Sequence, residues 1–108
     1  VLAAAPRDIT SADTRSLLAR NPRLVLLDVR TPDEFRQGRL RGAKLVPLSE
    51  LERRFREVPR NRAVVVYCAV GSRSRAAAGF LARQGYPEVY NMSDGIVGWY
   101  RSGFPVER

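Results

Sequence analysis

The residue best suited to chemistry in this chain is Cys68, its only cysteine. It follows the apolar run Ala63–Tyr67 and precedes a short loop and an alanine-rich helix. A cysteine at the start of a helix lies close to unpaired backbone amides and to the positive end of the helix dipole, and both lower the pKa of its thiol. This arrangement predicts a reactive thiolate. The loop consists of Ala69, Val70, Gly71, Ser72 and Arg73.

The residues of this loop favour a thiolate at Cys68. Gly71 allows the backbone to curl with its amides turned inward, Ser72 adds a hydroxyl, and Arg73 adds a fixed cation. The alternative is that Cys68 packs as a small buried apolar residue, as free cysteines often do. A cysteine in that role needs neither a glycine nor an arginine in the following loop.

The residue types that are missing restrict the chemistry further. The chain has no histidine, which excludes a Ser-His-Asp triad, a Cys-His pair and a histidine-ligated metal. One cysteine excludes an internal disulfide and any site with several thiolate ligands. The phosphate-loop pattern G-x-x-x-x-G-K-[ST] is absent as well. We therefore expect no metal and no cofactor.

The charge of the chain favours anionic partners. Lysine and arginine number 19 against 11 acidic residues, which gives a formal net charge of +8. These cations are scattered along the chain without the interleaved aromatic residues of a nucleic-acid surface, so no nucleic acid is expected. No apolar run approaches the roughly 20 residues of a membrane span, and Leu2–Ala5 is too short for a signal peptide. We expect a soluble, monomeric protein of the cytoplasm.

The 108 residues suffice for one domain, which we assign to residues 1–108. Apolar runs typical of buried strands alternate with capped helical segments, which predicts an α/β fold with a central, mostly parallel sheet and helices on both faces. Phe35 is expected to anchor one helix in the core, and Ser49 to cap another. Strands are expected at 24–27, 44–46, 63–67 and 89–90, and helices at 11–20, 31–38, 49–58, 76–84 and 95–102.

Ligands of such sheets bind beyond the carboxyl ends of the strands. Asp28 and Arg30 follow the strand that ends at Leu27, and we expect them on the same rim as Cys68. One interpretation is structural, with Asp28 capping loop amides or pairing with an arginine. The other is that Asp28 and Arg30 steady the loop around Cys68.

Three blocks of the sequence together resemble the rhodanese family of sulfurtransferases. The first is similar to the family pattern D-V-R-x-x-x-E-F-x-x-G-H-I-x-G-A, the second to its active-site loop and the third to its G-G-x-x-x-W segment. Two departures are Arg39-Leu40-Arg41, where the family usually has His-Ile-Pro, and Asp94 in place of the first glycine of the third block. The blocks are residues 26–43, 68–73 and 91–99.

The resemblance implies a rhodanese-like fold and a sulfurtransferase in which Cys68 is catalytic and residues 69–73 hold the substrate. Cys68 would take the sulfane sulfur of a small anionic donor such as thiosulfate as a persulfide. It would then pass this sulfur to cyanide or to a thiol, including that of a sulfur-trafficking protein. The alternatives are a catalytically silent binding module and a cysteine-dependent phosphatase or arsenate reductase. Those enzymes have five residues between cysteine and arginine, whereas this loop has four.

Overall fold

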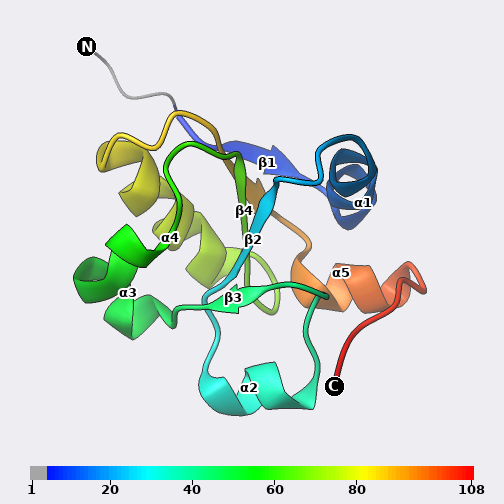
Figure 1. Cartoon of the computed structure of the whole chain (residues 1–108). Coiled ribbons are helices and arrows are strands. Elements are labelled where there is room, and N and C mark those ends of the chain that lie inside the picture. The colour runs from blue at the N-terminus through cyan, green and yellow to red at the C-terminus, as the bar shows by residue number, and fades with distance from the viewer. Residues whose placement is uncertain (1–4) are drawn as a thin grey trace.

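The computed structural model describes residues 5–108, so that all but the last residue of the stretch Leu2–Ala5 lies outside the described residues. Strands and helices alternate along the chain, as predicted (Figure 1). The elements are β1 (Arg7–Ile9), α1 (Ser11–Arg20), β2 (Val25–Asp28), α2 (Pro32–Gln37), β3 (Lys44–Leu45), α3 (Leu48–Arg54), the 3-10 turn η1 (Phe55–Glu57), β4 (Val64–Tyr67), α4 (Ser72–Arg83), β5 (Val89–Met92) and α5 (Gly95–Arg101).

The five strands form one sheet in the order β1-β5-β4-β2-β3, with every pairing parallel. This confirms the predicted fold class. β1 was not predicted from the sequence, because its three residues Arg7–Ile9 include two charged side chains and carry no apolar run. β1 pairs only with β5, at the edge of the sheet.

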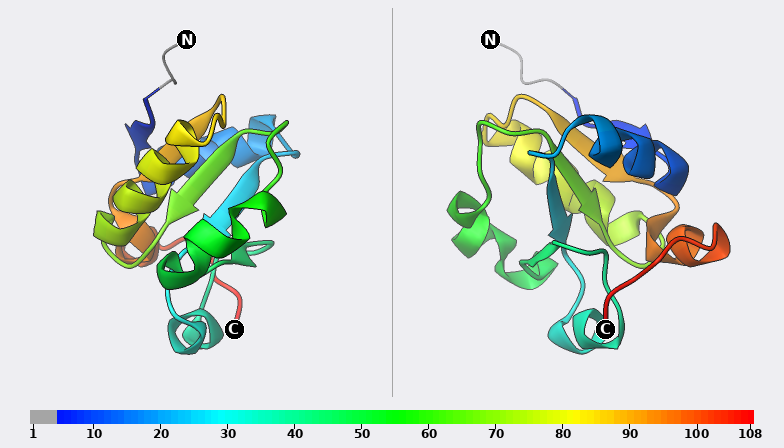
Figure 2. Two further views of the ribbon diagram at one scale, coloured as in Figure 1. Left: turned by 90° about the vertical axis from the view of Figure 1, so that its left-hand side faces the viewer. Right: turned by 45° about the vertical axis from the view of Figure 1, so that its right-hand side comes forward.

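Helices cover both faces of the sheet, as Figures 1 and 2 show. Successive side chains of a strand point to opposite faces, so each central strand supplies two cores. Val64 and Val66 of β4 pack in the core under α3 and α4, whereas Val65 and Tyr67 pack in the core with residues of α1 and α5. Burial on both faces explains why these strands are continuous apolar runs.

Two local predictions were wrong. Phe35 of α2 is only half-buried and lies under the guanidinium of Arg39, whose carbon Cζ is 4.8 Å from the ring centre. The short helix α2 has no buried residue, because it lies at the carboxyl end of the sheet rather than on a face (Figure 1). α3 begins at Leu48 after Pro47, so Ser49 is not its N-cap.

The order of the strands reverses the direction in which the chain runs across the sheet between β2 and β4. From β2 the chain continues to β3 on one side, and from β4 it continues to β5 on the other. The loops after β2 and β4 therefore diverge, and such a divergence at the carboxyl ends of parallel strands is where α/β folds bind ligands. Cys68 follows β4 at this point, and Asp28 ends β2.

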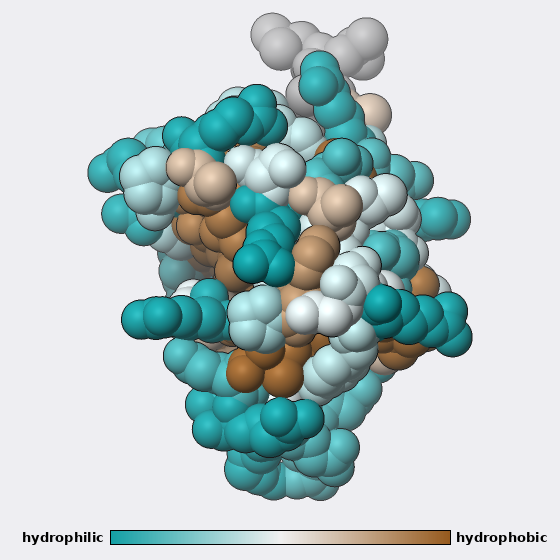
Figure 3. Space-filling view, turned by 90° about the vertical axis from the view of Figure 1, so that its right-hand side faces the viewer, coloured by the Kyte–Doolittle hydropathy of each residue, from teal (hydrophilic) through white to brown (hydrophobic). Residues whose placement is uncertain are grey.

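On the face shown in Figure 3, hydrophilic side chains interrupt the apolar surface. Tyr100 of α5 is the large apolar residue most exposed on the helices, at 43%.

Within residues 5–108, each helix falls short of the length and hydrophobicity that crossing a bilayer requires.

Candidate active site

The loop after β4 encloses the sulfur of Cys68 with hydrogen-bond donors. The backbone amide of Gly71 lies 3.2 Å from Sγ, and that of Ser74 lies 3.3 Å from it. The hydroxyl of Ser74 is 3.4 Å from the same atom. Cys68 is fully buried at 0% exposure, yet the amides around it are turned toward the sulfur. Sγ therefore lies where the amides would hold a bound anion, beside the first turn of α4.

The start of α5 explains why the loop amides face inward. The amide of Ile96 donates to the carbonyl of Cys68 at 2.9 Å, and that of Val97 donates to the carbonyl of Ala69 at 3.1 Å. With its carbonyls held on the outside by α5, the loop turns its own N–H groups toward Sγ. Gly71 has a φ of +99°, and a Cβ there would collide with the carbonyl oxygen of Ser93. The loop therefore depends on glycine at this position.

These contacts determine the acidity of the thiol. Burial raises the pKa of Cys68, but the hydroxyl of Ser74 and the amides of Ser74, Gly71 and Val70 act in the opposite direction. Together they hold the pKa of Cys68 below its ordinary value. The lowered pKa favours the thiolate, which is the nucleophilic form.

Ser74 is a site residue that the sequence analysis missed. It lies one position beyond the loop, yet both its amide and its hydroxyl contact Sγ. While Cys68 is a thiol, it donates to this hydroxyl, and the hydroxyl donates to Oδ1 of Asn91 at 2.6 Å. When Cys68 is a thiolate, the proton of the hydroxyl can turn to Sγ instead, which is how Ser74 lowers the pKa of the thiol. Nδ2 of Asn91 donates to Asp8 at 3.1 Å. The sequence did carry a signal for Ser74, because a hydroxyl in the first turn of a helix that starts beside a cysteine can reach the sulfur. Ser74 thus links the thiol to β5 and β1.

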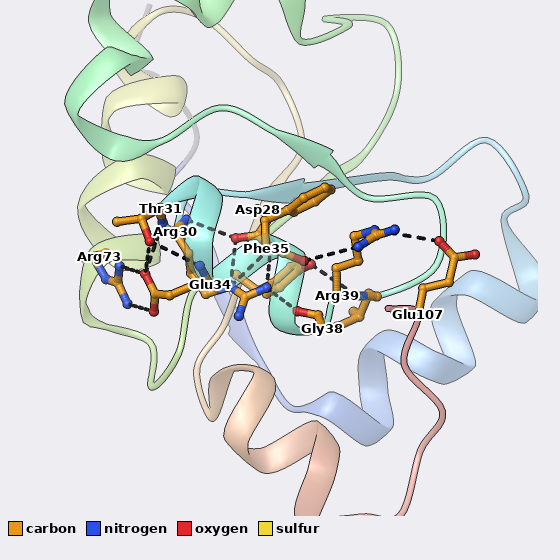
Figure 4. A network of polar contacts seen from close by, with 11 residues as sticks. Asp28, Arg30, Thr31, Glu34, Phe35, Gly38, Arg39, Arg73 and Glu107 are labelled. Atoms are coloured by element: carbon orange, nitrogen blue, oxygen red, sulfur yellow. Dashed lines mark hydrogen bonds and ion pairs between the residues drawn. The ribbon is translucent and has the colours of Figure 1, made fainter.

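Arg73, expected from the sequence to supply a fixed cation beside the thiol, is paired with a carboxylate. Its two terminal nitrogens donate to the two carboxylate oxygens of Glu34 in α2, at 2.7 and 2.9 Å (Figure 4). This hydrogen bonding lowers the pKa of Glu34 to about 2. Glu34 also accepts from the amide of Thr31 at 3.0 Å, as part of the box that caps α2. The Arg73–Glu34 pair therefore joins the loop around Cys68 to the start of α2.

Ala69, Val70 and Ser72 complete the loop, and the amide of Val70 also acts on the sulfur. Ala69 is half-buried, Val70 is 63% exposed, and Ser72 is exposed at the first position of α4. Among residues 5–108, no three His, Cys, Asp or Glu side chains are grouped so that they could hold a metal ion.

Comparison with known proteins identifies the family. Residues 10–102 match the family model of the rhodanese-like domain. The chain belongs to the rhodanese family. A sulfurtransferase of Allochromatium vinosum is 38% identical to it over 99 residues, which cover 92% of each chain. The thiosulfate sulfurtransferase GlpE of Actinobacillus succinogenes is 39% identical over 83 residues, which cover 77% of this chain and 75% of that one.

A solved structure agrees with this assignment. A rhodanese-related protein from Thermoplasma volcanium superposes on this rhodanese-like domain with a TM-score of 0.84 and 32% sequence identity. The match covers 94% of this chain and 97% of the other. The predicted rhodanese resemblance and fold are thereby confirmed, and the named relatives are sulfurtransferases.

The aspartate and arginine of the first rhodanese motif form a buried ion pair. Asp28 is 0% exposed and Arg30 is 5% exposed, and Nη2 of Arg30 lies 2.7 Å from Oδ2 of Asp28. The same nitrogen donates to the carbonyl of Gly38 at 2.7 Å, and so ties the end of β2 to the end of α2 (Figure 4). Asp28 thus pairs with an arginine, as its structural interpretation predicted.

Both departures from the rhodanese pattern have partners within the domain. The backbone of Arg39 exchanges two hydrogen bonds with Glu107, of 2.9 and 2.8 Å, and its guanidinium contacts Phe35. Asp94 accepts from the amide and the hydroxyl of Ser11, both at 3.0 Å. Arg39 therefore fastens the C-terminal segment, and Asp94 joins α5 to α1.

Proposed function

We propose that this rhodanese-like domain is a sulfurtransferase that carries sulfane sulfur as a persulfide on Cys68. The observation that supports this most strongly is the set of donors around Sγ, with the amides of Gly71 and Ser74 at 3.2 and 3.3 Å. These amides favour negative charge on sulfur before transfer and on the outer sulfur of the persulfide afterwards. Each preorganised donor of this kind is worth about 3 kcal/mol in other enzymes.

With thiosulfate as the donor, the Cys68 thiolate attacks the outer sulfur atom. A bond forms between Sγ and this sulfur while the sulfur–sulfur bond of thiosulfate breaks, and sulfite leaves with the electron pair. No proton is transferred, so the reaction needs no histidine. Since Cys68 is fully buried, we expect the donor to reach Sγ only after a small displacement of the loop.

The acceptor restores the thiolate. Cyanide or a thiolate attacks the outer sulfur of the persulfide, and the bond between the two sulfur atoms breaks so that Cys68 leaves as an anion. The products are thiocyanate or an organic persulfide. The same amides that held the outer sulfur then stabilise the departing Sγ. We include the thiol of a sulfur-trafficking protein among the acceptors.

One assay separates this proposal from its alternatives. The purified protein is incubated with thiosulfate plus cyanide and, in parallel, with an aryl phosphate. We expect thiocyanate formation and no phosphate release, because four residues separate Cys68 from Arg73 and this arginine is paired with Glu34. Phosphate release alone would favour a phosphatase. A folded protein inactive in both assays would favour a binding module.

The hydroxyl of Ser74 is predicted to contribute to the low pKa of the thiol. Ser74→Ala removes a group that stabilises the thiolate, so the pKa of Cys68 should rise. The rate of alkylation by iodoacetamide follows the thiolate fraction, and its pH profile should move to higher pH. The control is Ser72→Ala, which changes a neighbouring serine whose hydroxyl does not contact Sγ. Superimposable profiles for wild type and Ser74→Ala would contradict this role.

The Arg73–Glu34 pair is predicted to position the loop. Arg73→Ala and Glu34→Gln should each lower kcat/KM for thiosulfate about tenfold, because a misplaced loop misaligns the reacting sulfur. The glutamine can still cap α2. The double variant should be no worse than either single one, since both changes break the same contact. A loss confined to Arg73→Ala would instead indicate that Arg73 binds the donor directly.

A further inference from the structure

The hydroxyl of Ser74 lies between two acceptors. Its oxygen Oγ is 3.4 Å from Sγ of Cys68 and 2.6 Å from Oδ1 of Asn91. Both Ser74 and Asn91 are buried, at 0% and 1% exposure. A hydroxyl has a single proton to donate, so it serves one of the two acceptors at a time. Asn91 therefore competes with the sulfur of Cys68 for this proton.

Asp8 determines which end of the Asn91 amide faces Ser74. The two residues lie opposite each other in the pairing of β1 with β5, and Nδ2 of Asn91 donates to the carboxylate of Asp8 at 3.1 Å. A carboxylate accepts hydrogen bonds and donates none. It therefore holds the nitrogen of the amide on its own side and turns Oδ1 toward Ser74. The reverse orientation would set two acceptors against each other.

The charge on Sγ decides which acceptor takes the proton. In the thiol state, Cys68 donates to Oγ and Oγ donates to Oδ1, so each group has a partner. In the thiolate state the proton turns to Sγ, and Oδ1 is left without a donor, 2.6 Å from a lone pair of Oγ. A buried polar atom without a partner costs free energy, and the side chains of residues 5–108 contain none. Asn91 thus opposes the turn of the hydroxyl toward the thiolate.

We propose that Asn91 is a positioning residue that acts through Ser74 to favour the persulfide of Cys68 over the free thiolate. The inference rests on the proposed sulfurtransferase function and adds to it how the site retains sulfur. In the persulfide the negative charge lies on the outer sulfur and Sγ is neutral, so the hydroxyl returns to Asn91. A thiolate that receives less of this hydroxyl is a stronger nucleophile and a poorer leaving group. The domain therefore takes up sulfur readily and holds it.

The charged groups on the elements around the thiol have partners of their own. Asp94, beside the start of α5, accepts from Ser11. The others form three ion pairs, Asp28 with Arg30, Glu34 with Arg73, and Asp8 with Arg75. A variant at Asn91 changes none of these charges. A change in the titration of Cys68 in such a variant therefore reports on the hydrogen bonds of Ser74.

The first test is the titration of the thiol in Asn91→Leu, which removes the acceptor and keeps the approximate size of the side chain. The ultraviolet absorbance of the thiolate is followed against pH. Without Asn91 the hydroxyl is free to donate to Sγ, so the titration should move to lower pH. Below its midpoint the ratio of thiolate to thiol should rise about fivefold, the factor that corresponds to the net free energy of one hydrogen bond.

The second test is the equilibrium of the half-reaction. Protein is mixed with thiosulfate and sulfite at a fixed ratio, at a pH where the wild-type thiol is ionised. The Cys68 thiolate and thiosulfate are then in equilibrium with the persulfide and sulfite, and no proton is transferred. Intact mass gives the ratio of persulfide to free protein. This ratio should fall about fivefold in Asn91→Leu, because the same hydrogen bond now stabilises the thiolate.

A double-mutant cycle separates this role from a merely structural one. In the background of Ser74→Ala, Asn91→Leu should change neither the titration nor the equilibrium, because the hydroxyl through which Asn91 acts is absent. A shift of the same size in that background would overturn the proposal, since Asn91 would then act through packing.

A second pair of variants leaves the buried Asn91 in place and changes the exposed Asp8. Asp8→Ala removes the acceptor that orients the amide of Asn91. Asp8→Asn removes the same charge but keeps an oxygen that accepts from Nδ2. The thiol should titrate at lower pH in Asp8→Ala than in Asp8→Asn. Equal titrations of these two variants would contradict the assigned orientation of the amide.

The results distinguish the role of Asn91 from the function on which it rests. Wild-type protein that gains sulfur from thiosulfate, together with an Asn91→Leu variant of unchanged titration and equilibrium, would overturn the role of Asn91 and leave the sulfurtransferase intact. Folded wild-type protein that gains no sulfur would overturn the sulfurtransferase function, and with it the retention of sulfur by Asn91.

Discussion

Cys68→Ser is expected to reduce thiosulfate:cyanide sulfur transfer by at least a factor of about a thousand, the scale seen when a nucleophile is removed from other enzymes. Serine keeps the shape of the side chain but has no sulfur to form a persulfide, and its hydroxyl remains protonated at neutral pH. The amides of Gly71 and Ser74 can still donate to the new oxygen, at the positions where they now lie 3.2 and 3.3 Å from Sγ. The variant should therefore fold.

Two measurements make this result interpretable. The melting temperature of Cys68→Ser should stay close to that of the wild type, because the substitution creates no large cavity. Ser16→Ala changes an exposed serine of α1, outside the loop, and should retain the activity of the wild type. Normal activity in Cys68→Ser would show that the proposed nucleophile is wrong.

Asp28→Asn is expected to lower the free energy of unfolding by about 3 to 5 kcal/mol, as removal of one partner from a buried ion pair does in other proteins. The substitution preserves the size of the side chain but leaves the guanidinium of Arg30, which is 5% exposed, without its counter-ion. This loss is a large part of the stability of an ordinary domain. Chemical denaturation monitored by circular dichroism measures it.

Two further variants test whether the buried charge is the cause. Asp33→Asn makes the same change on an exposed side chain of α2, and its effect should stay within about 0.5 kcal/mol. The double variant Asp28→Leu, Arg30→Met removes both charges and should recover much of the stability lost in Asp28→Asn. Equal stabilities for Asp28→Asn and Asp33→Asn would contradict the account of this pair.

The predicted fold rested on strong local signals. The uninterrupted apolar runs that became β2 and β4 indicated strands buried on both faces, and the capping pattern at Thr31 located the start of α2. β1 carried no such signal, because its edge position and its pairing with β5 arise from the tertiary structure. Phe35 was misassigned for a related reason. Its apolar character favoured the core, but α2 lies off the end of the sheet, where Arg39 covers the ring instead.

The surroundings of Cys68 could be predicted from the sequence, but the partners of Arg73 and Ser74 could not. The position of Cys68 between a buried strand and a glycine-containing loop indicated a thiolate surrounded by amides. The partner of Arg73 was not predictable, because Glu34 is 39 positions away and meets it only through the packing of α2 beside the loop. The link from Ser74 to Asn91 likewise depends on how α4 packs against β5. Contacts between distant segments are fixed by the fold rather than by local patterns.

The most direct measurement is the mass of the intact protein before and after incubation with thiosulfate, followed by peptide mapping. A sulfurtransferase that works through Cys68 gains one sulfur atom, the gain maps to the peptide that contains Cys68, and cyanide removes it with formation of thiocyanate. Folded protein with an unchanged mass after thiosulfate treatment, or a sulfur atom gained elsewhere, would contradict the account.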